Sequence, residues 1–153
     1  MLWTIRRNAI GYAILGKNRR AAATARRVRD GWNIRSADGQ TRMRIKKNTP
    51  LSLLIWADGE EETATITMAG EARFPHPPMA KTLSFHRGNA AYRMEQSEDR
   101  TLSVFMEGKR IGSIINRLLW PGIELPDSAS PEFAALLYAL FIAMLGEEDM
   151  PVV

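Results

Sequence analysis

Apolar and polar residues alternate along short stretches through most of the chain, and tight turns separate these stretches. In residues 41–47, Met43 and Ile45 alternate with three basic side chains, which is the two-residue period of a half-buried β-strand. Asp38-Gly39 comes just before, and both residues tolerate the positive φ that hairpin turns require. The pattern therefore predicts a β-hairpin that joins Trp32–Arg35 to residues 41–47.

The same arrangement is repeated three more times along the chain. The predicted pairs are residues 51–57 and 63–68 around Asp58-Gly59, residues 80–87 and 90–96 around Gly88-Asn89, and residues 101–106 and 110–115 around Glu107-Gly108-Lys109. Between them, three prolines in Phe74–Pro78 predict a loop. Short alternating runs joined by turn signals indicate an antiparallel sheet or barrel, because no helical crossover separates them.

One helix is predicted near the C-terminus, over residues 130–146. Ser130 suits the N-cap, Pro131 the first helical position and Gly146 the C-cap. Between the caps nearly every side chain is apolar, and a helix that is apolar on every side is buried on every side. Its apolar run of thirteen residues is shorter than the ~20 that span a bilayer, so no transmembrane segment is predicted.

These elements define the expected architecture. We predict a mostly β (α+β) fold, in which an antiparallel barrel or sheet of hairpins surrounds the buried C-terminal helix. A length of 153 residues suits one domain, 1–153. The chain has no cysteine, which fits a reducing, cytoplasmic location.

The basic stretch at residues 19–29 supports two predictions. Its alanines and arginines favour a helix by propensity. As a strand, it would place Ala23, Ala25 and Arg27 on one face and Arg26 and Val28 on the other. The whole segment 1–29 contains no acidic residue; an organellar transit peptide has this composition, but serine is absent, so an intact basic N-terminal segment is favoured.

Charge is distributed unevenly along the sequence. Residues 1–50 carry thirteen basic and two acidic side chains, a net of +11, whereas the rest of the chain carries a net of −7. Such asymmetry suggests a basic face that meets a polyanion, either a phospholipid surface or nucleic acid. The alternative is a solvated face whose charges pair with the acidic half.

Candidate catalytic groups are sparse. His76 and His86 are the two histidines, and neither belongs to a metal-binding or catalytic spacing. No serine lies in a nucleophile elbow, and no glycine-rich phosphate loop is present. We therefore predict a non-enzymatic binding domain with no catalytic residue, metal or cofactor.

The basic residues are the candidates for ligand binding. Arg42, Arg44 and Lys46 share one face of their predicted strand at steps of ~6.6 Å, and Lys47 follows at its end. Near an anionic membrane each such side chain contributes about 1 kcal/mol. The remaining candidates for this basic face are Arg19, Arg20, Arg26 and Arg27. The alternative is the ordinary solvent face of an amphipathic strand.

Several segments resemble the tubby C-terminal-like fold in the same order. Trp32–Gln40 with Arg42–Lys47 is similar to the D-G strand pair with an Ile-basic-basic tail of the LURP-one-related and scramblase-like branches. Met106–Ile115 resembles their G-K hairpin, and Glu124-Leu125-Pro126 before the apolar helix resembles their final strand end. The resemblance covers roughly residues 30–146.

The resemblance implies binding of phosphoinositide or phospholipid at a membrane surface. The cysteines that scramblase-like members use for acylation are absent, which disfavours a lipid-anchored scramblase. The leading hypothesis is therefore a domain that binds anionic phospholipid from the cytoplasm, peripherally at the membrane. The alternatives are an interaction module for an acidic protein, and nucleic-acid binding through the Arg-rich half, although that half lacks interleaved aromatic residues for stacking on bases.

Overall fold

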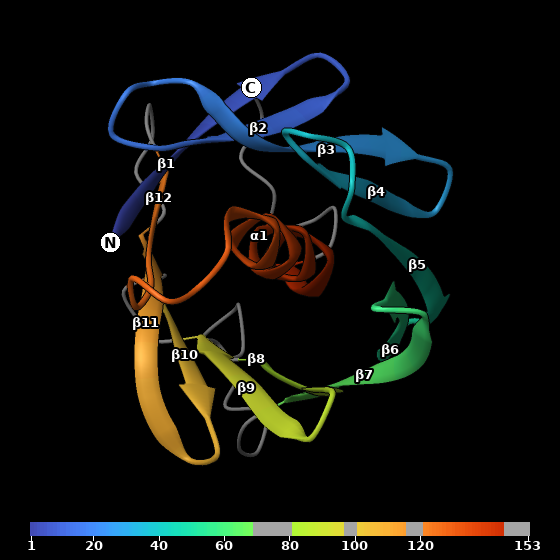
Figure 1. Ribbon diagram of the computed structural model, residues 1–153. Coiled ribbons are helices and arrows are strands. Elements are labelled where there is room, and N and C mark those ends of the chain that lie inside the picture. Colours follow the sequence, from blue (N-terminus) through green and yellow to red (C-terminus); the bar gives the residue numbers. More distant parts are fainter. Residues whose placement is uncertain (69–80, 97–100, 116–120, 146–153) are drawn as a thin grey trace, which may run out of the picture.

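The computed structural model describes residues 1–68, 81–96, 101–115 and 121–145, which form a closed antiparallel barrel around one helix (Figure 1). The strands are β1 (Leu2–Asn8), β2 (Gly11–Leu15), β3 (Ala21–Val28), β4 (Gly31–Ser36), β5 (Arg42–Thr49), β6 (Ser52–Ala57), β7 (Glu60–Met68), β8 (Lys81–Arg87), β9 (Ala90–Gln96), β10 (Leu102–Met106), β11 (Lys109–Ile115) and β12 (Gly122–Glu124). Each strand pairs with its neighbours in the sequence, and β1 pairs with β12 to close the barrel. The predicted fold class is confirmed.

The predicted turns connect the strands as expected. Asp58 and Gly59 have φ of 55° and 76°, and Glu107 and Gly108 have φ of 50° and 80°. Positive φ at both turn residues matches the right-handed twist of the flanking strands. At the β4–β5 turn, hydrogen bonds from the Ser36 hydroxyl and a backbone N–H lower the pKa of Asp38. The four predicted hairpins all form; the predicted loop at 74–78 lies outside the described residues.

The first 29 residues include β1, β2 and the whole of β3, so they are an integral part of the barrel. For residues 19–29 the strand prediction is confirmed and the helix prediction is wrong. The alanines explain why. Ala23 and Ala25 are buried on the inner face of β3, and α1 (Pro131–Leu145) lies closest to β3 and β4. Small inward side chains let the helix approach this wall, and this tertiary packing outweighs helix propensity.

The helix runs through the interior of the barrel (Figure 1). The Ser130 hydroxyl accepts a hydrogen bond from the Phe133 N–H at 3.2 Å, which confirms the predicted N-cap. Every side chain from Phe133 to Phe141 is buried. The prediction of a helix that is covered on all sides is thus confirmed. None of the described helical residues makes a segment that is long and apolar enough to cross a membrane.

A buried tyrosine links the barrel wall to the helix through a hydrogen bond. Tyr12, on β2, donates its hydroxyl to the Ala135 carbonyl at 2.6 Å. Its ring lies 4.8 Å from that of Tyr138 in an edge-to-face arrangement. Burial raises the pKa of Tyr12 well above its ordinary value, and the nearby Tyr138 hydroxyl adds to the shift. Tyr12 therefore stays neutral and satisfies its hydroxyl inside an otherwise apolar core.

Successive turns of the barrel lie at alternate ends. Because the strands alternate in direction, the β1–β2, β3–β4 and β5–β6 turns lie at one end, together with the last turn of α1. We call this the exit end. The β2–β3, β4–β5 and β6–β7 turns lie at the opposite end, where α1 begins, which we call the entry end.

Candidate functional site

The outer face of β3–β5 carries a patch of five exposed cations that we call the basic wall. Its members are Arg26 on β3, Arg35 on β4, and Arg42, Arg44 and Lys46 on β5. Those on β5 alternate with the buried residues of the same strand, as predicted. Their register is compact: Arg35 pairs directly with Arg42, and Asn33 lies between Arg26 and Arg44.

No acidic residue occupies an outward position on these three strands. None of the five cations forms an ion pair within the described residues. The Arg44 guanidinium lies 5.2 Å from the centre of the Trp56 ring, whose N–H donates to Glu61 at 3.0 Å. Like charges directly opposite each other, as in Arg35 and Arg42, destabilise a sheet. The repulsion between neighbouring cations of the basic wall therefore works against the stability of the fold.

The structure divides the eight predicted site residues among three places, which corrects the prediction of one face. Four belong to the basic wall: Arg26, Arg42, Arg44 and Lys46. Arg27 and Lys47 follow the parity of the buried residues on their strands, so they lie on the inner face at the exit end. Arg19 and Arg20 lie in or beside the β2–β3 turn at the entry end, because β3 begins only at Ala21 and runs away from them.

The sequence prediction does not include two further cations, Arg35 of the basic wall and Arg7, which contacts α1. Arg35 alternates with the buried residues of its strand. The register of the β4–β5 hairpin then places it directly opposite Arg42. Arg7 carries no such signal. Its role depends on barrel closure around the helix, which brings together residues 131 positions apart in the chain.

Cations also surround the C-terminal part of the helix. The Arg7 guanidinium donates to the Tyr138 hydroxyl through Nε, at 2.8 Å, and through Nη2. Lys81 donates to the Met144 carbonyl at 3.1 Å. Burial raises the pKa of Tyr138, and the Arg7 charge acts in the opposite direction. The last turn of α1 has no basic residue of its own, so the strands supply the positive charge that favours a helix C-terminus.

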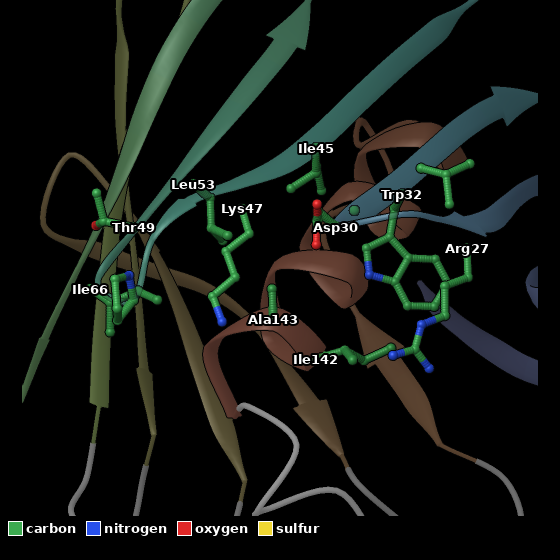
Figure 2. A pocket seen from close by; sticks show the side chains of 13 residues that line it. Arg27, Asp30, Trp32, Ile45, Lys47, Thr49, Leu53, Ile66, Ile142 and Ala143 are labelled. Carbon is green, nitrogen blue, oxygen red and sulfur yellow. The ribbon is translucent and has the colours of Figure 1, made fainter.

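Arg27 and Lys47 line a cavity of about 220 Å³ at the exit end (Figure 2). They point toward Ile142 and Ala143 of α1 from either side. Gly31 brings the adjoining β3–β4 turn close to β5, since a Cβ there would lie 1.8 Å from the Ile45 carbonyl oxygen. The turn is fixed further by the Lys47 N–H, which donates to the Asp30 carbonyl at 2.7 Å.

Exposed apolar side chains accompany the cations at the exit end. Ile10 is 60% exposed in the β1–β2 turn, Val28 is 36% exposed at the end of β3, and Leu51 is 50% exposed before β6. The Ile10 carbonyl accepts from the Arg27 N–H at 2.7 Å, so the first two of these segments are neighbours. Three large apolar residues thus project from successive hairpins at one end.

The residues considered for catalysis are scattered. His86 is exposed on β8, and His76 lies outside the described residues. Ser84 is exposed, Ser113 is buried, and each is on a strand. Within residues 1–68, 81–96, 101–115 and 121–145, no three His, Cys, Asp or Glu side chains are grouped so as to hold a metal ion.

Comparison with known proteins gives information about the fold. No family model matches the chain, and no curated protein does. Among solved structures, the chain is similar to the X-ray structure of a protein from Arabidopsis thaliana, with a TM-score of 0.57 and 10% sequence identity. The match covers 92% of this chain and 88% of the plant protein. The two chains therefore share their fold over nearly their whole lengths.

Proposed function

We propose that this chain is a tubby-like domain of the LURP-one-related type that binds anionic phospholipid, without catalysis, at the cytoplasmic surface of a membrane. The observation that carries the proposal is the basic wall: five exposed cations on three adjacent strands with no carboxylate among their outward positions. The sequence resemblance and the fold shared with the plant protein support the family part of the proposal.

The spacing of the basic wall suits an array of phosphates. Outward positions recur every ~6.6 Å along a strand, and neighbouring strands lie ~4.8 Å apart. The cations therefore form a two-dimensional grid rather than a single row. Each basic side chain close to an anionic leaflet contributes about 1 kcal/mol, so the wall as a whole supplies several kcal/mol of salt-sensitive attraction.

The exposed apolar residues at the exit end add a second component. Ile10, Val28 and Leu51 flank the end of the basic wall on successive hairpins. Cations beside apolar side chains are the combination that holds a protein at the boundary between headgroups and acyl chains. This arrangement favours a membrane over a purely polar partner.

The aromatic residue nearest the basic wall argues against nucleic acid. Bases of single strands stack on exposed aromatic rings, but Trp56 is covered by Arg44 and tied through its N–H to Glu61. Along β3–β5 the outward positions include no aromatic residue. A cationic surface without stacking platforms suits phosphate headgroups better than bases.

Co-sedimentation with vesicles tests the proposal. The wild type is compared with a variant carrying R26Q, R42Q, R44Q and K46Q, on phosphatidylcholine vesicles with and without phosphatidylserine or a phosphoinositide, at low and at physiological salt. We expect salt-sensitive binding to the acidic vesicles, and a loss on the order of a hundredfold to a thousandfold in the variant.

The matched control carries K17Q, R20Q, K109Q and R110Q, which make the same charge change at the entry end. It should retain most of the wild-type affinity. Equal losses in both variants would show that net charge alone drives binding, which contradicts a specific surface. If competing duplex DNA or an acidic protein displaced the wild type from the vesicles, one of those polyanions would be the better ligand.

A further inference from the structure

We propose that the cavity at the exit end is a second binding site, separate from the basic wall, for the head and first carbons of an anionic amphiphile. The ligand class is a carboxylate or phosphate monoester on an unbranched apolar chain. The cavity lies inside the barrel wall, whereas the basic wall lies on the outer face.

The two cations of the cavity differ from the other inward cations. Arg7 is bound to Tyr138 and Lys81 to the Met144 carbonyl. Arg27 and Lys47 have no side-chain hydrogen bond or ion pair within the described part of the chain. They also border the same cavity: β4 separates their strands, and its Trp32 lies opposite Arg27 and opposite Ile45, two residues before Lys47. An anionic head placed there would receive charge-assisted hydrogen bonds from both sides.

The cavity has an apolar side beside its charged residues. Trp32, Leu53 and Ile66 line it from the barrel wall, and Ile142 lines it from α1 (Figure 2). Its volume of about 220 Å³ is below the ~300–1,000 Å³ of sites for drug-sized ligands. It therefore suits a small amphiphile, or the end of a larger one whose chain continues out of the mouth beside Pro50.

One carboxylate in the cavity opposes this ligand. Asp30 lies in the lining with Arg27 and Lys47, which leaves a net charge of +1 on these three residues. Removing the Asp30 charge should therefore strengthen the binding of an anion. This gives a test in which a substitution improves affinity, so that a damaged fold cannot produce the expected result.

Titration with soluble probes tests the proposal. Decyl phosphate and decanoate, below their micelle concentrations, are compared with decanol and inorganic phosphate by calorimetry and by the NMR signal of the Trp32 indole N–H. Both charged amphiphiles should bind saturably and shift that signal, whereas decanol and phosphate should bind at least tenfold more weakly.

The variants use two pairs of neighbouring cations, Arg26 with Arg27 and Lys46 with Lys47. In each pair the first residue lies on the outer face of the barrel and the second lines the cavity. R27Q with K47Q should weaken decyl phosphate binding about a hundredfold, since a hydrogen bond to a charged group is worth about tenfold or more each. R26Q with K46Q makes the same charge change on the outer face and should change it less than threefold. D30N should tighten binding severalfold.

Other results would overturn the assignment of the cavity as a binding site. If the probes bind without shifting Trp32, or if R26Q with K46Q weakens binding as much as R27Q with K47Q, the cavity is not the site. If no amphiphile binds while R27Q with K47Q lowers the melting temperature, the two cations serve only to complement the helix C-terminus. Vesicle binding through the basic wall is measured separately, so one proposal can fail while the other holds.

Discussion

Arginines in two regions of the barrel have very different surroundings. On β8 and β9, Arg87 and Arg93 each hold a carboxylate: Arg87 lies 2.9 Å from Asp58, and Arg93 lies 2.7 Å from Glu95. Each guanidinium also lies over an aromatic ring, 5.5 Å from that of Phe133 and 4.7 Å from that of Phe105. On β3–β5, five cations share an outer face with no carboxylate at all.

The difference separates structural charge from charge that is available to a partner. The arginines of β8 and β9 have protein partners and need no ligand. Those of the basic wall have no carboxylate partner within the described residues and repel one another, so their charge is available to a ligand. Substitutions that add or remove a partner test this difference between paired and unpaired charge.

Among single substitutions, the largest effect is expected when the basic wall is given a carboxylate. Asn33 lies in register between Arg26 and Arg44, so Asn33→Glu would pair with both and add a negative charge. Affinity for acidic vesicles should fall roughly thirtyfold to a hundredfold. Thermal stability should rise slightly, because opposite charges across strands contribute about 0.2–1 kcal/mol. Asn33→Gln is the control; if it reduces binding equally, the loss comes from shape rather than charge.

Removing the partner of an inward arginine should cost stability instead of binding. Tyr138→Phe deletes the hydroxyl that accepts from Arg7 and should destabilise the fold by about 1–3 kcal/mol, since it removes hydrogen bonds from a charged donor. Differential scanning calorimetry measures the change. Tyr92→Phe is the matched control, because its ring packs against Phe85 and its hydroxyl has no partner within the described residues. Equal melting temperatures for the wild type and Tyr138→Phe would show that this link is dispensable.

The apolar residues of the exit end should contribute less than the cations. Ile10→Ser and Leu51→Ser should each weaken binding to acidic vesicles about fivefold, if each residue loses about 1 kcal/mol of burial in the membrane. This part of the affinity should persist at high salt. Leu2→Ser removes a similarly exposed residue at the entry end and should leave binding unchanged. A similar loss with Leu2→Ser would place the membrane contact elsewhere.

The smallest effect is expected at the paired arginines. The hydrogen bond from Arg87, together with its charge, lowers the pKa of Asp58. A lowered pKa means that the pair stabilises the fold above the ordinary range of an Asp carboxyl, and that this contribution is lost as the pH falls through the folded-state pKa. Asp58→Asn should thus lower the melting temperature slightly at neutral pH, by the modest amount of an exposed ion pair.

The difference between Asp58→Asn and the wild type should shrink as the pH falls from about 5 toward 2. Melting temperatures measured across this range check it, with vesicle binding at neutral pH as the second readout. A difference that grew toward low pH would contradict the assigned role of Arg87. A change in vesicle binding would contradict the separation between the two regions.

Local pattern was enough to predict the hairpins and the buried helix. Asp58, Gly59 and Gly108 adopt the positive φ that their residue types tolerate, and the cap at Ser130 marks the helix start. At Ala21–Val28 the sequence does not decide between helix and strand, because alanine occupies both faces of the strand and hides the alternation. What decides the conformation there is contact with α1, more than a hundred residues later in the chain.

The candidate site was predicted only in part, for a related reason. Strand alternation places Arg42, Arg44 and Lys46 together, and the structure keeps them so. Alternation also assigns Arg27 and Lys47 to the other face, but whether that face is solvent or barrel interior depends on closure around the helix. Sequence proximity grouped both residues with the outer cations, whereas the closed barrel turns them into the lining of a cavity.

Paramagnetic broadening by spin-labelled lipids tests the central claim most directly. Amide signals of the protein are recorded on phosphatidylserine-containing bicelles with and without a headgroup spin label. We predict selective broadening along β3–β5, at Asn33 and Arg44, and at the Ile10 turn, with β8 and β9 unaffected. Broadening centred on Arg87 and Arg93, or none at any described strand, would contradict the assignment of the basic wall as the membrane-binding surface.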